Sequence, residues 1–147
     1  MGTFNSILVP IDGSANAKRV LLYAGYVAQL SKASVGILHV INIPKMLPVF
    51  DHIHTGVYIP NSVVEDALEA GRGIVEDALA HLPPDVKAES FIETGLPTDV
   101  IVDFCREHNY DLIIIGTRGL GKFQEFMVGS VSKYVVSHAS CPVMVVK

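Results

Sequence analysis

Short apolar runs recur along the chain, and the first of them ends at Asp12-Gly13-Ser14. Runs of this length, rich in valine, isoleucine and leucine, are typical of strands that are buried on both faces of a sheet. The third run alternates apolar and polar residues, so we expect it to be less buried than the others. The predicted strands are 7–11, 34–40, 86–93, 111–115 and 142–146.

Between these runs, apolar residues return every three or four positions, which is the spacing of one helix face. Ser14 is the expected N-cap of the first helix, and Ser62-x-x-Glu65 is a capping-box signature for the second. Pro83 stops that second helix, and Pro97 lies near the first position of the third. The predicted helices are 15–31, a segment from about 62 to 81, a segment that starts near 97, and 130–140.

Strands that alternate with helices imply right-handed crossovers. The sequence therefore predicts an α/β fold: one domain over residues 1–147, with an open parallel five-stranded sheet and helices on both faces. In such sheets ligands bind beyond the carboxyl ends of the strands, where the winding direction reverses. We expect the ends of the first, second and fourth strands to surround a single crevice. The segment 41–60 carries three prolines and no clear period, as functional or mobile loops often do.

A spaced glycine pattern follows the fourth strand. Gly116, Gly119, Gly129 and Ser130 read Gly-x2-Gly-x9-Gly-Ser behind a run of leucine and isoleucine. A strand that ends in spaced glycines and leads into a helix can place backbone N–H groups around a phosphate. Ser130, at the start of the last helix, can cap that helix or contact a phosphate oxygen. The pattern predicts nucleotide binding.

Five segments of the chain resemble the universal stress protein family, and the resemblance covers the whole sequence. It implies a sheet of order 3-2-1-4-5 and homodimers, often with the last strands paired across the two-fold axis. It also implies the ATP-binding branch of the family, because every defined position of the glycine pattern is present. The matching segments are Ile-Leu-Val-Pro-Ile-Asp-Gly-Ser at 7–14, Glu-Thr-Gly-Leu-Pro at 93–97, Asp-Leu-Ile-Ile-Ile-Gly-Thr-Arg-Gly at 111–119, Gly-Ser-Val-Ser at 129–132 and Cys-Pro-Val-Met-Val-Val at 141–146.

The resemblance also assigns roles to particular residues. Pro10 and Ile11 would wall the adenine, Val40 would offer backbone groups to its edge, and Ile115 would pack against the base. Asp12 would approach the ribose and phosphates, with Mg²⁺ as a possible bridge, and Arg118 is a candidate phosphate contact. The residues that would line the ribose and phosphate sites are Gly116, Gly119, Gly129, Ser130 and Val131. The implied ligand is ATP, AMP or ADP.

Composition narrows the classes of function. The chain has 147 residues, a formal net charge of -4 and no run of basic residues, which argues against non-specific nucleic-acid binding. No apolar stretch approaches the roughly 20 residues of a membrane span, and the first residues do not resemble a signal peptide. Cys105 and Cys141 lack metal-ligand spacing, which favours a reduced, cytoplasmic protein.

Several of these residues also have a purely structural interpretation. The glycines can be ordinary turn glycines, and Asp12 can cap the first helix. Gly119-Leu-Gly-Lys122 does not have Walker A spacing. Asp51-His-Ile-His54 is expected to be a solvated loop rather than a metal pair. Three other residues are expected to be structural: His39 as a satisfied core or edge histidine, Cys105 in a helix core, and Cys141 as a small buried residue.

The sequence thus leaves three functions open. The first is a dimeric, ATP-binding stress-response or signalling module with at most slow hydrolysis, because no positioned base is evident. The second is a metal-dependent ATPase or nucleotidyl-transfer enzyme. The third is a protein-interaction module that binds no nucleotide.

Overall fold

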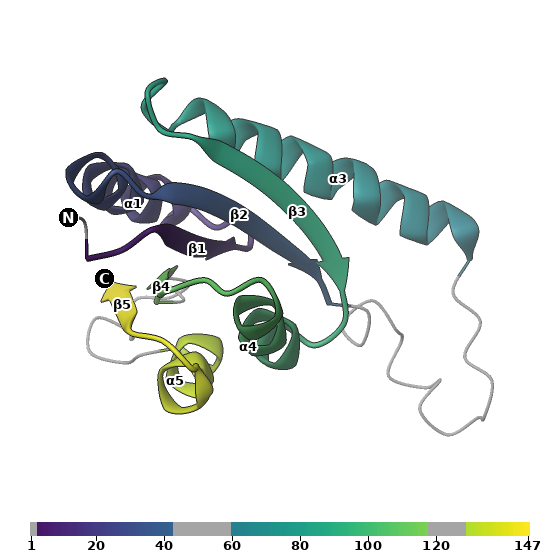
Figure 1. Ribbon diagram of the computed structural model, residues 1–147. Coiled ribbons are helices and arrows are strands. Elements are labelled where there is room, and N and C mark those ends of the chain that lie inside the picture. Colours follow the sequence, from purple (N-terminus) through teal and green to yellow (C-terminus); the bar gives the residue numbers. More distant parts are fainter. Residues whose placement is uncertain (1–2, 43–59, 118–128) are drawn as a thin grey trace.

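The computed structural model describes residues 3–42, 60–117 and 129–147. Strands and helices alternate along these segments (Figure 1). The elements are β1 (Ser6–Ile11), α1 (Ala17–Ser31), β2 (Ser34–Ile41), α3 (Asn61–Ala80), β3 (Ala88–Thr94), α4 (Pro97–Glu107), β4 (Leu112–Gly116), α5 (Ser130–His138) and β5 (Val143–Val146).

The strands form one five-stranded sheet in the order β3-β2-β1-β4-β5, and all neighbours run parallel. On the central strand β1, Ile7 is in register with both Val35 of β2 and Leu112 of β4. The winding direction reverses at β1, because the chain moves outward to β3 on one side and to β5 on the other. The fold class and strand order expected from the sequence are therefore confirmed.

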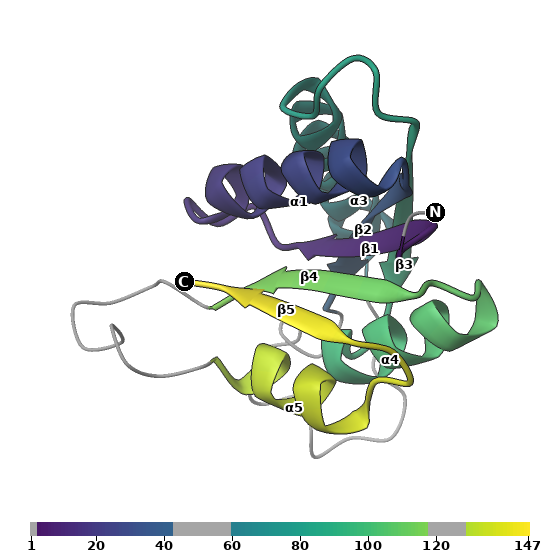
Figure 2. The same ribbon diagram turned by 60° about the vertical axis from the view of Figure 1, so that its left-hand side comes forward.

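Two helices cover each face of the sheet. In Figure 2, α1 and α3 lie above the strands, and α4 and α5 lie below them. Successive side chains of β1 point to opposite faces of the sheet. Ile7 and Val9 pack in the hydrophobic core under α1 and α3, and Leu8 packs in the core under α4 and α5. All three side chains are fully buried, so the central strand is covered on both faces, as its unbroken apolar sequence predicted.

The first helix begins later than predicted. Asn16, and not Ser14, is the N-cap residue of α1, and no side chain caps the helix. The reason lies in the preceding turn, where the Ser14 N–H donates to Asp12 Oδ1 at 3.0 Å and Gly13 has a positive φ of 80°. Asp12 thereby closes an Asx turn, and the helix starts only after the chain has left that turn.

The capping box predicted for the second helix does not form. Pro60 is the N-cap residue of α3, and no side-chain cap hydrogen bond forms. Ser62 therefore lies inside the first turn of α3. Pro97, in contrast, occupies the first turn of α4 as predicted, where its missing N–H costs nothing.

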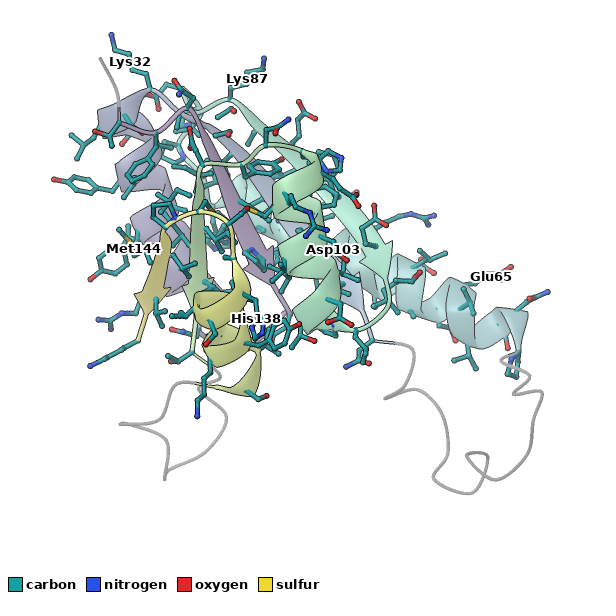
Figure 3. All side chains as sticks on the ribbon, turned by 60° about the horizontal axis from the view of Figure 1, so that its bottom comes forward. Lys32, Glu65, Lys87, Asp103, His138 and Met144 are labelled. Atoms are coloured by element: carbon teal, nitrogen blue, oxygen red, sulfur yellow. The ribbon has the colours of Figure 1, made fainter. Side chains whose placement is uncertain are left out.

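The edges of the sheet are less buried than its centre. The side chains of β3 are half-buried or exposed, in line with the prediction for the third strand. Lys32, which follows α1, and Lys87, which precedes β3, lie at the end of the molecule where the strands begin (Figure 3). Within the described residues, no helix combines the length and the apolar character needed to cross a membrane.

Candidate functional site

A cleft opens at the carboxyl edge of the sheet, around the point where the winding direction reverses. The space between its walls is about 680 Å³, which includes some of the open solvent at its mouth. The start of α1 lies above this edge and the start of α5 below it, on the left of Figure 2. The lining residues are Pro10, Ile11, Asp12, Ser14, Asn16, Ala17, Val20, Leu38, Val40, Pro97, Ile101, Ile115, Gly116, Thr117, Val131 and Ser132.

One part of the cleft is apolar. Leu38 of β2 and Ile115 of β4 are buried side chains that line it, and Val40 lies half-buried at the end of β2. Ile101 of α4 adds a further buried apolar surface. Since these side chains lack polar atoms, they suit a flat, weakly hydrated group such as a heterocyclic base.

The polar part of the cleft begins at the end of β1. Asp12 is exposed and lines the cleft, and its Oδ1 accepts the Ser14 N–H. This hydrogen bond fixes the direction of the carboxylate at the cleft mouth. Asp12 is also the one titratable side chain among the described lining residues. The carboxylate does not cap α1, so that plainer interpretation of Asp12 was wrong.

Asn16 joins the turn after β1 to two other strands. Its Nδ2 donates to the backbone oxygen of Thr117 at 3.3 Å and to that of Val146 at 3.4 Å. Those carbonyls follow β4 and end β5. One side-chain amide therefore holds together the turn, the end of β4 and the end of β5 at the edge of the sheet where the cleft opens.

Gly116 is explained by close packing. An added Cβ would lie 2.8 Å from Asn16 Nδ2 and 2.8 Å from Val20 Cγ2. Among the described glycines, a positive φ is found at Gly13 and Gly95, so Gly116 does not depend on that freedom. The glycine instead lets α1 and its preceding turn approach the end of β4.

The start of α5 faces the same cleft. Gly129 is the N-cap residue, with φ −61° and ψ 158°, and Val131 and Ser132 line the cleft. The backbone N–H groups of a first helical turn have no partner within the helix, so they are available to an anion. Ser132 is buried and donates its hydroxyl to the Gly129 oxygen at 3.0 Å.

Ser130 does not have the capping role proposed for it. It is the first residue of α5, its side chain is exposed, and no side chain caps the helix. The capping position belongs to Gly129, whose φ and ψ any residue can adopt. A requirement for glycine at 129 would therefore come from the space in front of the helix.

Asn42 carries a buried polar atom just after β2, two residues beyond Val40. Its Oδ1 has no hydrogen-bond partner among the described residues. A buried acceptor without a partner is costly.

The structure brings together most of the residues that the sequence singled out. Gly129 and Ser130 open α5 next to the cleft, while Arg118 and Gly119 lie outside the described residues, as do Lys122 and Asp51–His54. The predicted residues that line the cleft are Pro10, Ile11, Asp12, Val40, Ile115, Gly116 and Val131.

Several lining residues were missed. Asn16 is the N-cap residue of α1 and Ser132 lies in the first turn of α5. Polar residues are visible in the sequence at these positions but are common at helix starts. In the sequence, the pattern around Leu38, Val20 and Ile101 indicated only core residues. Pro97 was noted only as a helix start, and Ala17 was not singled out. Ser14 and Thr117 also line the cleft, and both belong to the strand ends that the sequence predicted to surround the crevice.

His39 is structural, as expected. Its ring Nδ1 lies 3.0 Å from the Ile11 oxygen, which joins β2 to the end of β1.

Across residues 3–42, 60–117 and 129–147, no group of three or more histidine, cysteine, aspartate or glutamate side chains is arranged to hold a metal ion.

Comparisons with known proteins agree with this architecture. The profile of the Universal stress protein family matches residues 3–147. Universal stress protein YxiE of Bacillus subtilis is 33% identical over 150 residues, which cover 98% of this chain and 99% of the relative. The structure of universal stress protein UspA from Lactobacillus plantarum superposes with a TM-score of 0.75 at 27% identity, with full coverage of both chains.

A more distant structure shares the fold and was solved with a ligand. It is the universal stress protein from Archaeoglobus fulgidus in complex with dAMP, with a TM-score of 0.61, 23% identity and full coverage of both chains. At that identity the likeness establishes the fold. The family profile over almost the whole sequence, and the full-length relative above, establish more: this chain belongs to the universal stress protein family.

Proposed function

We propose that the chain binds an adenine nucleotide, ATP before AMP or ADP, in the cleft at the carboxyl edge of the sheet. In this proposal it acts as a dimeric stress-response or signalling module. The observation that carries the proposal is the meeting of three features in one cleft: an apolar slot, the carboxylate of Asp12 and the first turn of α5. A base, a ribose and phosphates need these three environments in this order.

The base would occupy the apolar slot. Pro10, Val40 and Ile115 would bury its faces. Asn42, two residues after Val40, has a buried side-chain oxygen with no hydrogen-bond partner among the described residues, and in this proposal the base reaches that oxygen. Adenine carries an exocyclic amino group that can donate to such an oxygen, whereas hypoxanthine has a carbonyl at that position. The unpartnered atom therefore fits an amino-bearing base.

The phosphates would lie against the start of α5. The free N–H groups of its first turn and the positive end of the helix dipole favour negative charge there. The glycine pattern places Gly129 at this point with no side chain in the way. Arg118 and Gly119 belong to the same pattern and remain part of the proposal.

Magnesium would be shared between Asp12 and the phosphates. Mg²⁺ in nucleotide sites commonly takes one or two carboxylates and completes its shell with phosphate oxygens and water. Asp12 is the one carboxylate among the described lining residues. Since no described lining residue can serve as a second acid or base, we propose binding with at most slow hydrolysis.

The dimer would form through β5. This strand ends the sheet, and its outer backbone groups face no neighbouring strand among the described elements. Its side chains Val143, Met144 and Val145 are half-buried. An apolar edge strand of this kind is a template for pairing with a second copy.

We also propose a cytoplasmic location, which suits the two free cysteines.

The first experiment is to denature freshly purified protein and identify any released nucleotide by chromatography and mass spectrometry. Adenine nucleotide near one per chain supports the proposal. No nucleotide, followed by no calorimetric signal with added Mg-ATP, overturns it and favours the protein-interaction module. Turnover well above background that requires divalent metal would instead favour the ATPase.

Gly129→Val tests the placement of the phosphates. The new side chain would occupy the space in front of α5, so we expect ATP affinity to fall by at least about a hundredfold, or about 3 kcal/mol. Calorimetry measures the affinity and circular dichroism the fold. Gly73→Val is the matched control, because an added Cβ at Gly73 meets no atom within 4 Å. Unchanged binding in Gly129→Val would refute this site.

A further inference from the structure

The two cysteines of the chain meet although they are far apart in sequence. Cys105 lies on α4 and Cys141 lies just before β5. Their Sγ atoms are 3.3 Å apart, at a sequence separation of 36 residues. The chain contains two cysteines in total, so this contact involves every thiol that the protein has.

The contact joins a buried thiol to one that solvent can reach. Cys105 is 0% exposed, whereas Cys141 is partly exposed, so the expectation that Cys141 is buried was wrong. It is partly exposed because it precedes an edge strand that nothing covers on its outer side within the described elements. A soluble oxidant can therefore reach Cys141 and not Cys105.

Backbone hydrogen bonds hold Cys105 and Pro142, the residue after Cys141, in place. The Tyr110 N–H donates to the Cys105 oxygen at 3.0 Å, and the Ile113 N–H donates to the Pro142 oxygen at 3.0 Å. The Cys105 thiol also lies 3.6 Å from the Tyr110 oxygen, as a weak donor. The sulfur pair thus sits between ordered elements, and rotation of the side chains is enough to change the distance between the sulfurs.

The surroundings keep both thiols largely protonated. Burial raises the pKa of Cys105 to about 12, and burial is also the main cause that raises the pKa of Cys141. The Asp111 carboxylate raises both pKa values further. Since the thiolate is the reactive form, spontaneous reaction at neutral pH is slow.

We propose that Cys105 and Cys141 form a redox-sensitive dithiol, which a peroxide oxidises to a disulfide between α4 and the start of β5. The Cys141 thiolate attacks one peroxide oxygen, the O–O bond breaks, and a sulfenic acid and hydroxide form. The Cys105 sulfur then attacks the Cys141 sulfur, the S–O bond breaks, and water leaves. In total, two thiols and one hydrogen peroxide give one disulfide and two waters.

The disulfide would join two functional parts of the molecule. Ile101, one helical turn before Cys105, lines the cleft. β5, which begins two residues after Cys141, forms the open edge of the sheet. Oxidation would therefore fix the helix that carries one cleft wall to the strand at the open edge.

The test treats the purified, fully reduced protein with hydrogen peroxide. We expect both thiols to become resistant to iodoacetamide and the intact mass to fall by about 2 Da, with recovery after addition of dithiothreitol. Non-reducing electrophoresis should show a monomeric chain. Two alkylatable thiols after treatment, or a disulfide-linked dimer as the main product, would overturn the proposal.

Single-thiol variants are the controls. Cys141→Ser should leave Cys105 unreacted under the same treatment, because no oxidant can reach it. Cys105→Ala should give a Cys141 sulfenic acid that dimedone traps, with no loss of about 2 Da. If Cys105→Ala proves unstable because its side chain is in the core, the alkylation count of the unaltered protein still decides the outcome. Equal oxidation of Cys105 with and without Cys141 would contradict the order of steps.

Discussion

At the scale of single residues, Asp12 has a structural role in the turn and a chemical role in the proposed site. One carboxylate oxygen closes the turn with Ser14, which sets the direction of the side chain. The group remains exposed at the cleft mouth, where a hydrated cation can approach. Its position follows from the turn, so the role of this residue can be tested by removing the carboxylate alone.

Asp12→Ala should weaken binding of Mg-ATP about tenfold or more, as loss of a charged contact does, and metal-free ATP much less. Calorimetric titrations with and without magnesium measure the two affinities. Asp66→Ala is the control, because Asp66 is exposed on α3 and its removal changes the net charge equally. Equal losses for the two forms of ATP would remove the metal role from Asp12.

At the scale of elements, two helical glycines differ in how closely their surroundings are packed. Gly25 of α1 is buried, and an added Cβ would lie 2.7 Å from Cδ of Pro83. Gly73 of α3 is exposed, and an added Cβ would meet nothing within 4 Å. Alanine favours a helix over glycine by about 1 kcal/mol, so only packing can reverse the sign of such a substitution.

Gly25→Ala should therefore lower the free energy of unfolding by about 1–3 kcal/mol, the usual cost of overpacking. Gly73→Ala should raise it by about 0.5–1 kcal/mol. Urea denaturation followed by circular dichroism gives both values. A rise in the free energy of unfolding of Gly25→Ala would show that helix propensity, and not the contact with Pro83, decides stability at Gly25.

The elements could be predicted well where the apolar pattern alone defines them. All five strands and the helices around them follow from short apolar runs and helical spacing, and Pro97 marked its helix start. The predicted start of the first helix was wrong because a local turn precedes it. The Ser14 N–H donates to the Asp12 carboxylate in that turn, and the N-cap residue is therefore Asn16. The glycine pattern led to the cleft, but polar residues such as Ser132 could not be told from ordinary helix positions.

At the scale of the whole molecule, the sequence predicted the strand order and the crevice but not the contact between the two cysteines. Cys105 and Cys141 lack any recognised spacing, and only the crossing of α4 over the sheet brings their sulfurs together. A bond between them would close a long loop, which restricts the unfolded chain more than the folded one. The effect of oxidation on stability can therefore be estimated from the sequence separation.

Peroxide-oxidised protein should be more stable than reduced protein by about 2–4 kcal/mol. For a chain of this size that corresponds to a rise in melting temperature of about 5–15 °C. Differential scanning calorimetry with and without dithiothreitol measures the shift, and Cys141→Ser should show none. A lower melting temperature after oxidation would mean that the disulfide strains the contact between α4 and β5.

The amide of Asn16 has a consequence for how such a chain can change during evolution. A methyl group at Gly116 needs space that Asn16 and Val20 now fill. A shorter residue at 16 would release part of that space but would remove the side-chain donor to the Thr117 carbonyl and one of the two donors to the Val146 carbonyl. Neither position can drift alone without loss. Selection therefore acts on residues 16 and 116 jointly, and in an alignment of relatives the two positions should covary.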